Sequence, residues 1–136
     1  MGKFLRINDP DELDSVHDLI HDCYFDVDDI AFDPLTSVLS FRFRRLPKRH
    51  PWWRDFLTTS KMSPTIECYL RIYDVESYSI NDKERVGTYD FNVLHYESSR
   101  RCITVLTGTP IDIQIVVRNF GISVEETDNA FESRSG

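Results

Sequence analysis

Hydrophobic and polar residues near the N-terminus recur with the period of an α-helix. Apolar residues stand at intervals of three and four, at Leu13, Val16 and Ile20. This spacing places them on one stripe, which is typical of a helix packed on a core. Asp9 followed by Pro10 is typical of an N-cap and a first helical residue. The pattern predicts a helix from Pro10 to His21 or Asp22.

From residue 25 onward the period changes to two residues, which is the period of a half-buried strand. The alternation is strong in residues 39–43, 66–72, 89–93 and 111–117, and weaker in 25–32, 103–107 and 120–124. No second helical pattern follows a strand, so parallel crossover connections are not expected. We therefore predict an α+β protein, with one N-terminal helix packed on a mostly antiparallel, curved sheet or small sandwich of six or seven strands.

Polar segments between the strands predict the connections and the domain boundary. Residues 81–84, 97–100 and 119–121 have the composition of turns, and we expect them to be hairpin connections. A chain of 136 residues suits one domain. Residues 126–136 are polar and lack periodicity. We therefore expect a single domain over residues 1–125, followed by a flexible C-terminal tail.

Composition restricts the class of protein and its compartment. The net charge of −7 disfavours nonspecific binding of the whole body to nucleic acid or anionic membranes. No run approaches the ~18 apolar residues of a membrane helix, and no secretory signal pattern opens the chain. Cys23, Cys68 and Cys102 are widely spaced, which is typical of buried thiols in a reducing compartment. We expect a cytoplasmic protein without a membrane partner.

Charge is unevenly distributed along the chain. Residues 42–61 contain seven basic side chains against one acid, Asp55. The first 41 residues contain ten acids against Lys3 and Arg6. Within the basic stretch, residues 47–64 form a long connection without clear periodicity, and such loops in compact domains are usually functional or disordered. The two stretches are the candidate surfaces for binding.

The candidate binding residues lie in the basic-aromatic segment, residues 42–61. They combine cationic groups with indole rings: Arg45, Lys48, Arg49, Trp52, Trp53 and Arg54. Arg suits carboxylates and phosphates, and Trp offers a broad apolar face. This predicts a non-catalytic interaction module that binds a protein partner through the basic-aromatic segment and an acidic N-terminal face. Two alternatives stay open. The segment could instead bind an anionic small molecule or single-stranded nucleic acid, or its tryptophans could cap the core while its arginines pair with the acidic helix.

One pair of histidines has the spacing of metal ligands. His17 and His21 stand four residues apart on the predicted helix, but Asp18 occupies the position where a zinc protease motif has Glu. A polar helix face is the better explanation of the pair. Four acids resemble a calcium loop but lack its glycine and its third ligand: Asp26, Asp28, Asp29 and Asp33. We therefore predict no cofactor, and an unrecognised metal-dependent hydrolase is the second alternative function.

Overall fold

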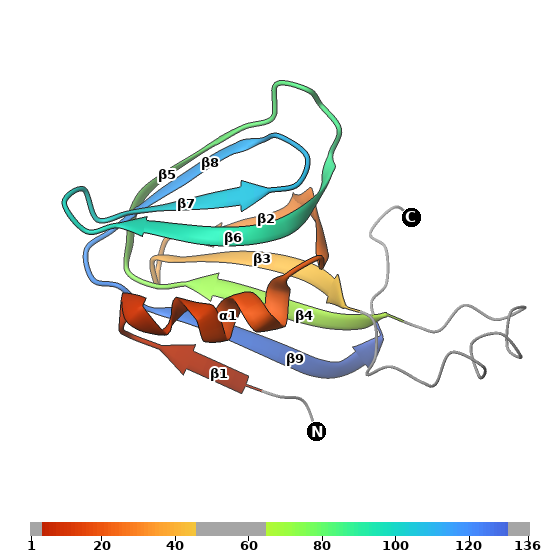
Figure 1. Ribbon diagram of the computed structural model, residues 1–136, viewed down its shortest axis with the longest axis horizontal. Helices are drawn as coiled ribbons and strands as arrows, with labels where there is room; N and C mark the ends of the chain where they lie inside the picture. Colours follow the sequence, from red (N-terminus) through yellow and green to blue (C-terminus); the bar gives the residue numbers. More distant parts are fainter. Residues whose placement is uncertain (1–3, 46–64, 131–136) are drawn as a thin grey trace, which may run out of the picture.

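The computed structural model describes residues 4–45 and 65–130 of the chain (Figure 1). Within them lie one α-helix, preceded by a single 3-10 turn, and nine strands. In chain order the elements are β1 Phe4–Ile7, η1 Pro10–Glu12, α1 Leu13–Ile20, β2 Tyr24–Asp33, β3 Val38–Arg45, β4 Ile66–Ile72, β5 Val75–Asn81, β6 Thr88–Glu97, β7 Cys102–Thr107, β8 Asp112–Val117 and β9 Ile122–Ala130. The predicted α+β class is confirmed. The predicted number of six or seven strands is wrong.

The strands are arranged in the order β1-β9-β4-β3-β2-β6-β7-β8-β5, and every neighbouring pair is antiparallel. Strands β2 and β6 pair only over residues 24–26 and 88–90. The sheet folds at this short junction into two facing layers, β1-β9-β4-β3-β2 and β6-β7-β8-β5 (Figure 1). The alternation of apolar and polar residues along the strands places one face of each layer on a shared core.

Aromatic rings join the two layers in the core. Phe25 of β2 stacks on Phe91 of β6, with 4.5 Å between ring centroids. Phe41 and Phe43 of β3 meet the same Phe91 ring edge-on, at 5.8 and 5.4 Å. All four rings are fully buried. Offset and edge-to-face contacts of this kind stabilise a core beyond simple burial.

Helix α1 lies against the core along one side of the two layers, in contact with β6 and β9 (Figure 1). Val16 and Ile20 are fully buried, as the apolar stripe predicts. The carboxylate of Asp9 accepts a hydrogen bond from the Asp11 amide at 2.9 Å, so Asp9 is the cap. It caps the 3-10 turn of residues 10–12, and the α-helix itself begins at Leu13. No helix within the described residues is long and apolar enough to cross a bilayer.

The two ends of the layered sheet differ. At one end the chain crosses between the layers twice, through Asp74 and through residues 118–121. The Asp74 carbonyl accepts from the Arg118 amide at 2.9 Å, and its carboxylate accepts from the Asn119 side chain at 2.7 Å. At the other end β3 terminates at Arg45 and β4 begins at Ile66. This second end, the open end, carries the candidate site described below.

Two of the three predicted hairpin connections are wrong. Residues 119–121 lead from β8 to β9, and residues 81–84 lead from β5 to β6, yet neither pair of strands is adjacent in the sheet. Both segments carry the chain from one part of the sheet to another. Of the three predicted hairpin connections, only residues 97–100 join strands that are neighbours in the sheet, β6 and β7. Turn composition identifies where the chain changes direction, but not which strand it meets next.

Three strand segments were not predicted from the sequence pattern. Strand β1 has four residues, too few to show a period. In β5 a register shift between Val75 and Ser77 breaks the alternation. Strand β9 continues to Ala130, past residue 125, where the sequence placed the end of the domain. It is held there by β4, which pairs with it as far as Ala130. The sheet therefore includes residues 126–130, and residues 131–136 lie outside the described part of the chain.

Shortening the buried side chains of α1 tests its place in the core. Val16→Ala or Ile20→Ala should lower the free energy of unfolding by roughly 1–4 kcal/mol, because each leaves a cavity under the helix. Urea denaturation measures the change, with Ser15→Ala on the exposed side of α1 as the control. If both core variants are as stable as the control, the helix does not pack as described.

Candidate interaction site

At the open end the inward-facing positions of the strands change from apolar to charged. Phe43, Cys68 and Val124 are buried on the core side of β3, β4 and β9. Two residues further along their strands, Arg45 and Glu126 occupy inward positions where the core has ended. Arg45 Nη1 donates to Glu126 Oε2 at 3.0 Å, and the pair thus spans β4. Residues 81 positions apart in the chain therefore close the end of the core with a salt bridge.

Two adjoining hollows border this salt bridge. The first, about 390 Å³, lies between α1, β1 and the ends of β3, β4 and β9. The second, about 470 Å³, lies between the end of α1 and the adjoining ends of β2 and β3. Both are lined by Asp18, Leu19 and Arg45. We call the two hollows together the end groove.

Apolar side chains form much of the end groove. Its first hollow is lined by Phe4, Leu5, Leu19, Phe43 and Val124. Phe4 at one border and Tyr24 at the other leave 62% and 50% of their surface exposed. Aromatic residues beside an apolar hollow are the usual anchors of protein interfaces. The end groove therefore has the composition expected of a docking surface.

Helix α1 supplies the wall of the end groove. Its buried stripe faces the core, and a neighbouring stripe carries Ser15, Asp18 and Leu19 into the lining. Asp22, which follows the helix, adopts a positive φ of 64° and lines the second hollow. Asp18 is exposed and forms no ion pair with any residue in the described ranges. The wall thus presents a carboxylate that is available to a ligand.

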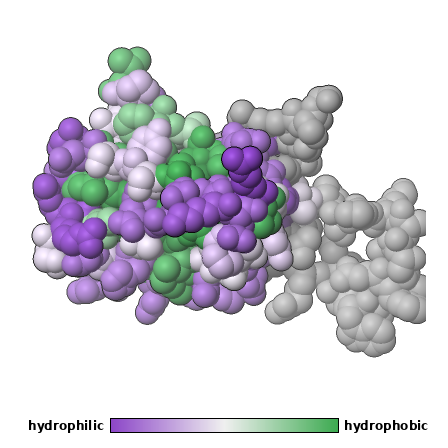
Figure 2. Space-filling view, turned by 90° about the horizontal axis from the view of Figure 1, so that it is seen from above, coloured by the Kyte–Doolittle hydropathy of each residue, from purple (hydrophilic) through white to green (hydrophobic). Residues whose placement is uncertain are grey.

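A different face of the molecule carries another hollow, of about 420 Å³, between the end of β5 and the connection from β7 to β8, with Leu106, Pro110 and Ile111 in its lining. Figure 2 shows the molecule from above, from the side of β5 and β8, where apolar residues lie in separate patches between polar ones. Single exposed apolar residues are normal on a protein surface and need no ligand. The end groove differs because two exposed aromatic residues, Phe4 and Tyr24, line it.

The structure places one of the six predicted binding residues. Arg45 lies in the end groove, where it lines both hollows and pairs with Glu126. The other five, Lys48, Arg49, Trp52, Trp53 and Arg54, lie outside the described residues. Their part in binding stays a prediction from the sequence.

The first arginines of the basic-aromatic segment are engaged by acids of the sheet. Arg42 lies on the outer face of β3, nearly buried, with Asp29 at 3.4 Å and Glu67 at 3.1 Å. Burial opposes the charge on Arg42, but the hydrogen bond to Glu67 and the charge of Asp29 outweigh it and raise the pKa of Arg42. Arg44 lies 3.4 Å from Asp26. Within β3, therefore, the positive charge of the segment is already balanced by the sheet.

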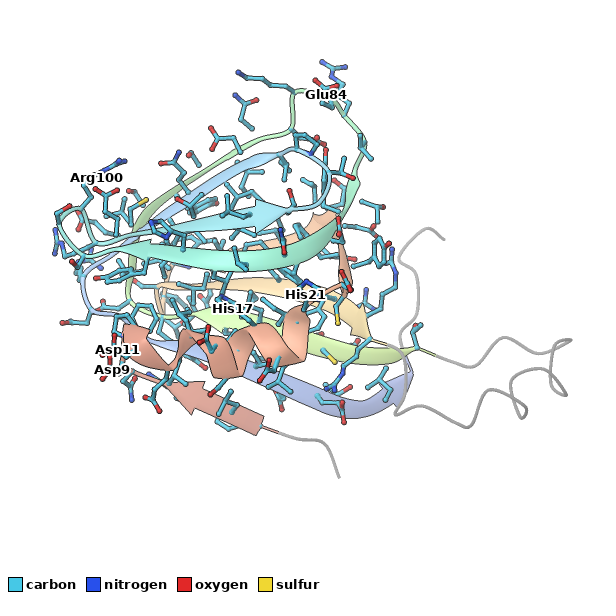
Figure 3. All side chains as sticks on the ribbon, in the orientation of Figure 1. Asp9, Asp11, His17, His21, Glu84 and Arg100 are labelled. Carbon is cyan, nitrogen blue, oxygen red and sulfur yellow. The ribbon has the colours of Figure 1, made fainter. Side chains whose placement is uncertain are left out.

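These ion pairs also account for part of the acidic N-terminal face. Asp26 and Asp29, from the calcium-like run, lie opposite arginines of β3. The acids of the helical region remain exposed along its length. Asp9 and Asp11 lie at one end of the helix and His21 at the other (Figure 3). The exposed part of the acidic face thus lies along η1 and the outer side of α1, whose last turn borders the end groove, and at Asp28 and Asp33 of β2.

The two histidines of α1 have different surroundings (Figure 3). His17 Nε2 lies 3.0 Å from the Leu94 amide nitrogen and 3.1 Å from the Leu94 carbonyl oxygen, and only 19% of its side chain is exposed. His21 is 54% exposed, with Nδ1 3.2 Å from Asp22. Within the described ranges no group of three His, Cys, Asp or Glu residues could hold a metal ion. His17 covers the free edge of β6, which explains its position without a metal.

The cysteines are buried free thiols, as the sequence predicts. Burial raises the pKa of Cys23 to about 11 and that of Cys68 to about 12. Cys23 lines the second hollow and Cys68 the first. Both thiols are therefore protonated at neutral pH, and neither is an activated nucleophile.

Comparison with protein-family models, with curated proteins and with solved structures finds no match for this chain. We therefore infer the function from the residues of the chain itself. Leu19 is an apolar residue beside the buried stripe of α1, and this is the sequence signal that could have indicated the groove wall. Nothing in the sequence around α1 indicates that Phe4 of β1 and Glu126 of β9 complete the lining of the first hollow.

Replacing each histidine separately distinguishes a structural role from a metal site. His17→Ala should lower the free energy of unfolding by about 1–3 kcal/mol, because the Leu94 backbone loses its partner. His21→Ala removes an exposed imidazole from the same helical region and should change the free energy of unfolding by less than ~0.5 kcal/mol. Thermal or urea unfolding gives both values. Stabilisation of the wild type by added Zn²⁺, abolished in both variants, would instead show that the pair binds metal.

Thiol labelling tests the burial of Cys23 and Cys68. At pH 8 both should react slowly with iodoacetamide in the folded protein, and faster as pH approaches 11, while all three thiols react quickly in denaturant. The folded state holds thiol protons that the unfolded state releases, so the free energy of unfolding should also fall as pH rises above 9. Rapid labelling of Cys68 at pH 8 would contradict its place under the groove.

Proposed function

We propose that this protein is a non-catalytic interaction module that binds a protein partner at its open end. The binding surface consists of the end groove, the exposed acids of α1 and the basic-aromatic segment that continues from Arg45. The observation that carries the proposal is the apolar hollow between two exposed aromatic residues, Phe4 and Tyr24. Such a combination supplies the desolvated anchor that protein interfaces depend on.

The chemistry of the end groove supports binding more than catalysis. Its two arginines are engaged by acids, Arg45 by Glu126 and Arg44 by Asp26. Its thiols, Cys23 and Cys68, have raised pKa values and are protonated at neutral pH. The remaining lining consists of apolar side chains and of the polar residues Ser15, Asp18, His21, Asp22 and Thr65. The groove residues can bind and orient the surface of a partner, and neither thiol is activated as a nucleophile.

The alternative of an anionic ligand is less favoured by the described residues. Arg42, Arg44 and Arg45 all lie against carboxylates, so a phosphate would have to compete with Asp29, Asp26 and Glu126. The net charge of −7 also repels a polyanion. Binding of single-stranded nucleic acid would therefore depend on residues beyond Arg45. We place the module in the cytoplasm, because buried free thiols suit a reducing compartment.

Substitutions in the basic-aromatic segment test its part in binding. Trp52→Ala or Trp53→Ala should weaken the affinity for the purified partner by at least ~2 kcal/mol, since aromatic anchors dominate interfaces. Neutralising Arg49 and Arg54 should mainly slow association and reduce its dependence on salt. Surface plasmon resonance measures both effects.

Thermal stability must be measured on the same variants. If the tryptophan variants lose ~3–5 kcal/mol of stability, and the molecules that remain folded bind the partner normally, the tryptophans pack in the core. That result would contradict the proposed role of the segment.

A further inference from the structure

The charges that border the end groove do not cancel. Arg45 is neutralised by Glu126 at 3.0 Å, and Arg44 lies beside Asp26. On the helix side, Asp18 lacks an ion-pair partner among the described residues. Within residues 4–45 and 65–130, the ion-pair partner of Asp22 is the exposed imidazole of His21. An incoming ligand therefore meets negative charge on the wall formed by α1.

The position of Asp18 gives this charge a specific role. Asp18 lines both hollows, as does Arg45, which is paired with Glu126, so Asp18 lies where the two hollows adjoin. Leu19, the next residue, also lines both. A ligand that occupies the groove must therefore contact a carboxylate and an apolar side chain at the same place. This requires a cation next to an apolar group.

We propose, on the basis of the interaction function above, that the end groove binds a short segment of the partner in which a Lys or Arg stands next to a large apolar residue. The cationic side chain lies against Asp18 and Asp22. The apolar side chain packs on Leu19 and Val124, beside the exposed ring of Phe4. Charge complementarity and apolar burial then act at one site, and together they give the specificity that neither supplies alone.

An acidic segment is disfavoured by the same geometry. Its carboxylate would lie beside Asp18 without a free cation, because Arg45 would have to separate from Glu126. Removing one partner from a partly buried ion pair leaves the other uncompensated, which is costly. The groove therefore discriminates by charge against acidic segments, although the neighbouring basic-aromatic segment carries the opposite sign.

Titration of the ¹⁵N-labelled full chain with defined peptides tests the proposal. The first probe is a short peptide that alternates lysine with leucine and phenylalanine, and the second has glutamate in place of each lysine. The lysine peptide should shift the backbone amide signals of Leu5, Asp18, Leu19 and Val124, and the glutamate peptide should not. Asp18→Asn should weaken the lysine peptide roughly two- to fivefold, the contribution of an ion pair near a protein surface.

A matched control comes from the same helix. Asp14→Asn makes the same charge change one turn away, where the side chain is fully exposed and lines neither hollow. Its affinity for the lysine peptide should stay at the wild-type value. Equal losses for Asp14→Asn and Asp18→Asn would overturn the proposal, because they would indicate general attraction to an acidic helix.

Other occupants give different results, and each overturns the proposal. If a second copy of the chain fills the groove, Asp18→Asn changes the oligomeric state in sedimentation and the lysine peptide causes no shifts. If the chain's own basic residues fill it, neutralising Lys48 and Arg49 shifts the Asp18 and Leu19 signals and creates peptide binding that the wild type lacks. A partner that binds the protein normally while both peptides fail would overturn this inference and leave the interaction function standing.

Discussion

The rest of the structure depends on how one strand edge is covered. Strand β6 pairs with β2 over three residues and then separates from it, which leaves the β6 backbone beyond Asp90 without a strand on that side. Helix α1 and the turn after it fill the gap. The Asp22 amide donates to the Phe91 carbonyl at 3.0 Å, the Phe91 amide donates to the Cys23 carbonyl at 2.9 Å, and the His17 ring meets Leu94. Buried backbone groups must be satisfied, so the helix is held in this orientation.

The end groove follows from that orientation and from the length of the strands. With its inner stripe on the core, α1 has to present Asp18 and Leu19 toward the open end. Strands β3 and β9 extend past the apolar core, so their next inward positions, Arg45 and Glu126, meet water and each other instead of a facing layer. A charged end next to an apolar lining is thus a consequence of the fold, and we propose that it lets the surface bind a partner and select it by charge.

The sequence pattern predicted the features that depend on the spacing of nearby residues, such as the bounds of a strand and the buried side of the helix. The alternation in β4 matches its observed bounds, Ile66–Ile72, and the stripe of α1 is buried as expected. The bulge in β5 hid a strand because one extra residue reverses the alternation. The partners of His17 and Arg45 are 77 and 81 residues away, at Leu94 and Glu126, so no local pattern could reveal them. For this reason the end groove could be identified only from the tertiary structure.

The central claim is that the open end, and no other face, receives the partner. Amide hydrogen exchange of the full chain with and without the purified partner tests it most directly, since binding slows exchange where backbone becomes shielded. We expect added protection in residues 4–7, 15–22 and 124–126, with the outer face of β7 and β8 unchanged. Protection confined to β5, β7 or β8, with the groove residues unaffected, would contradict it.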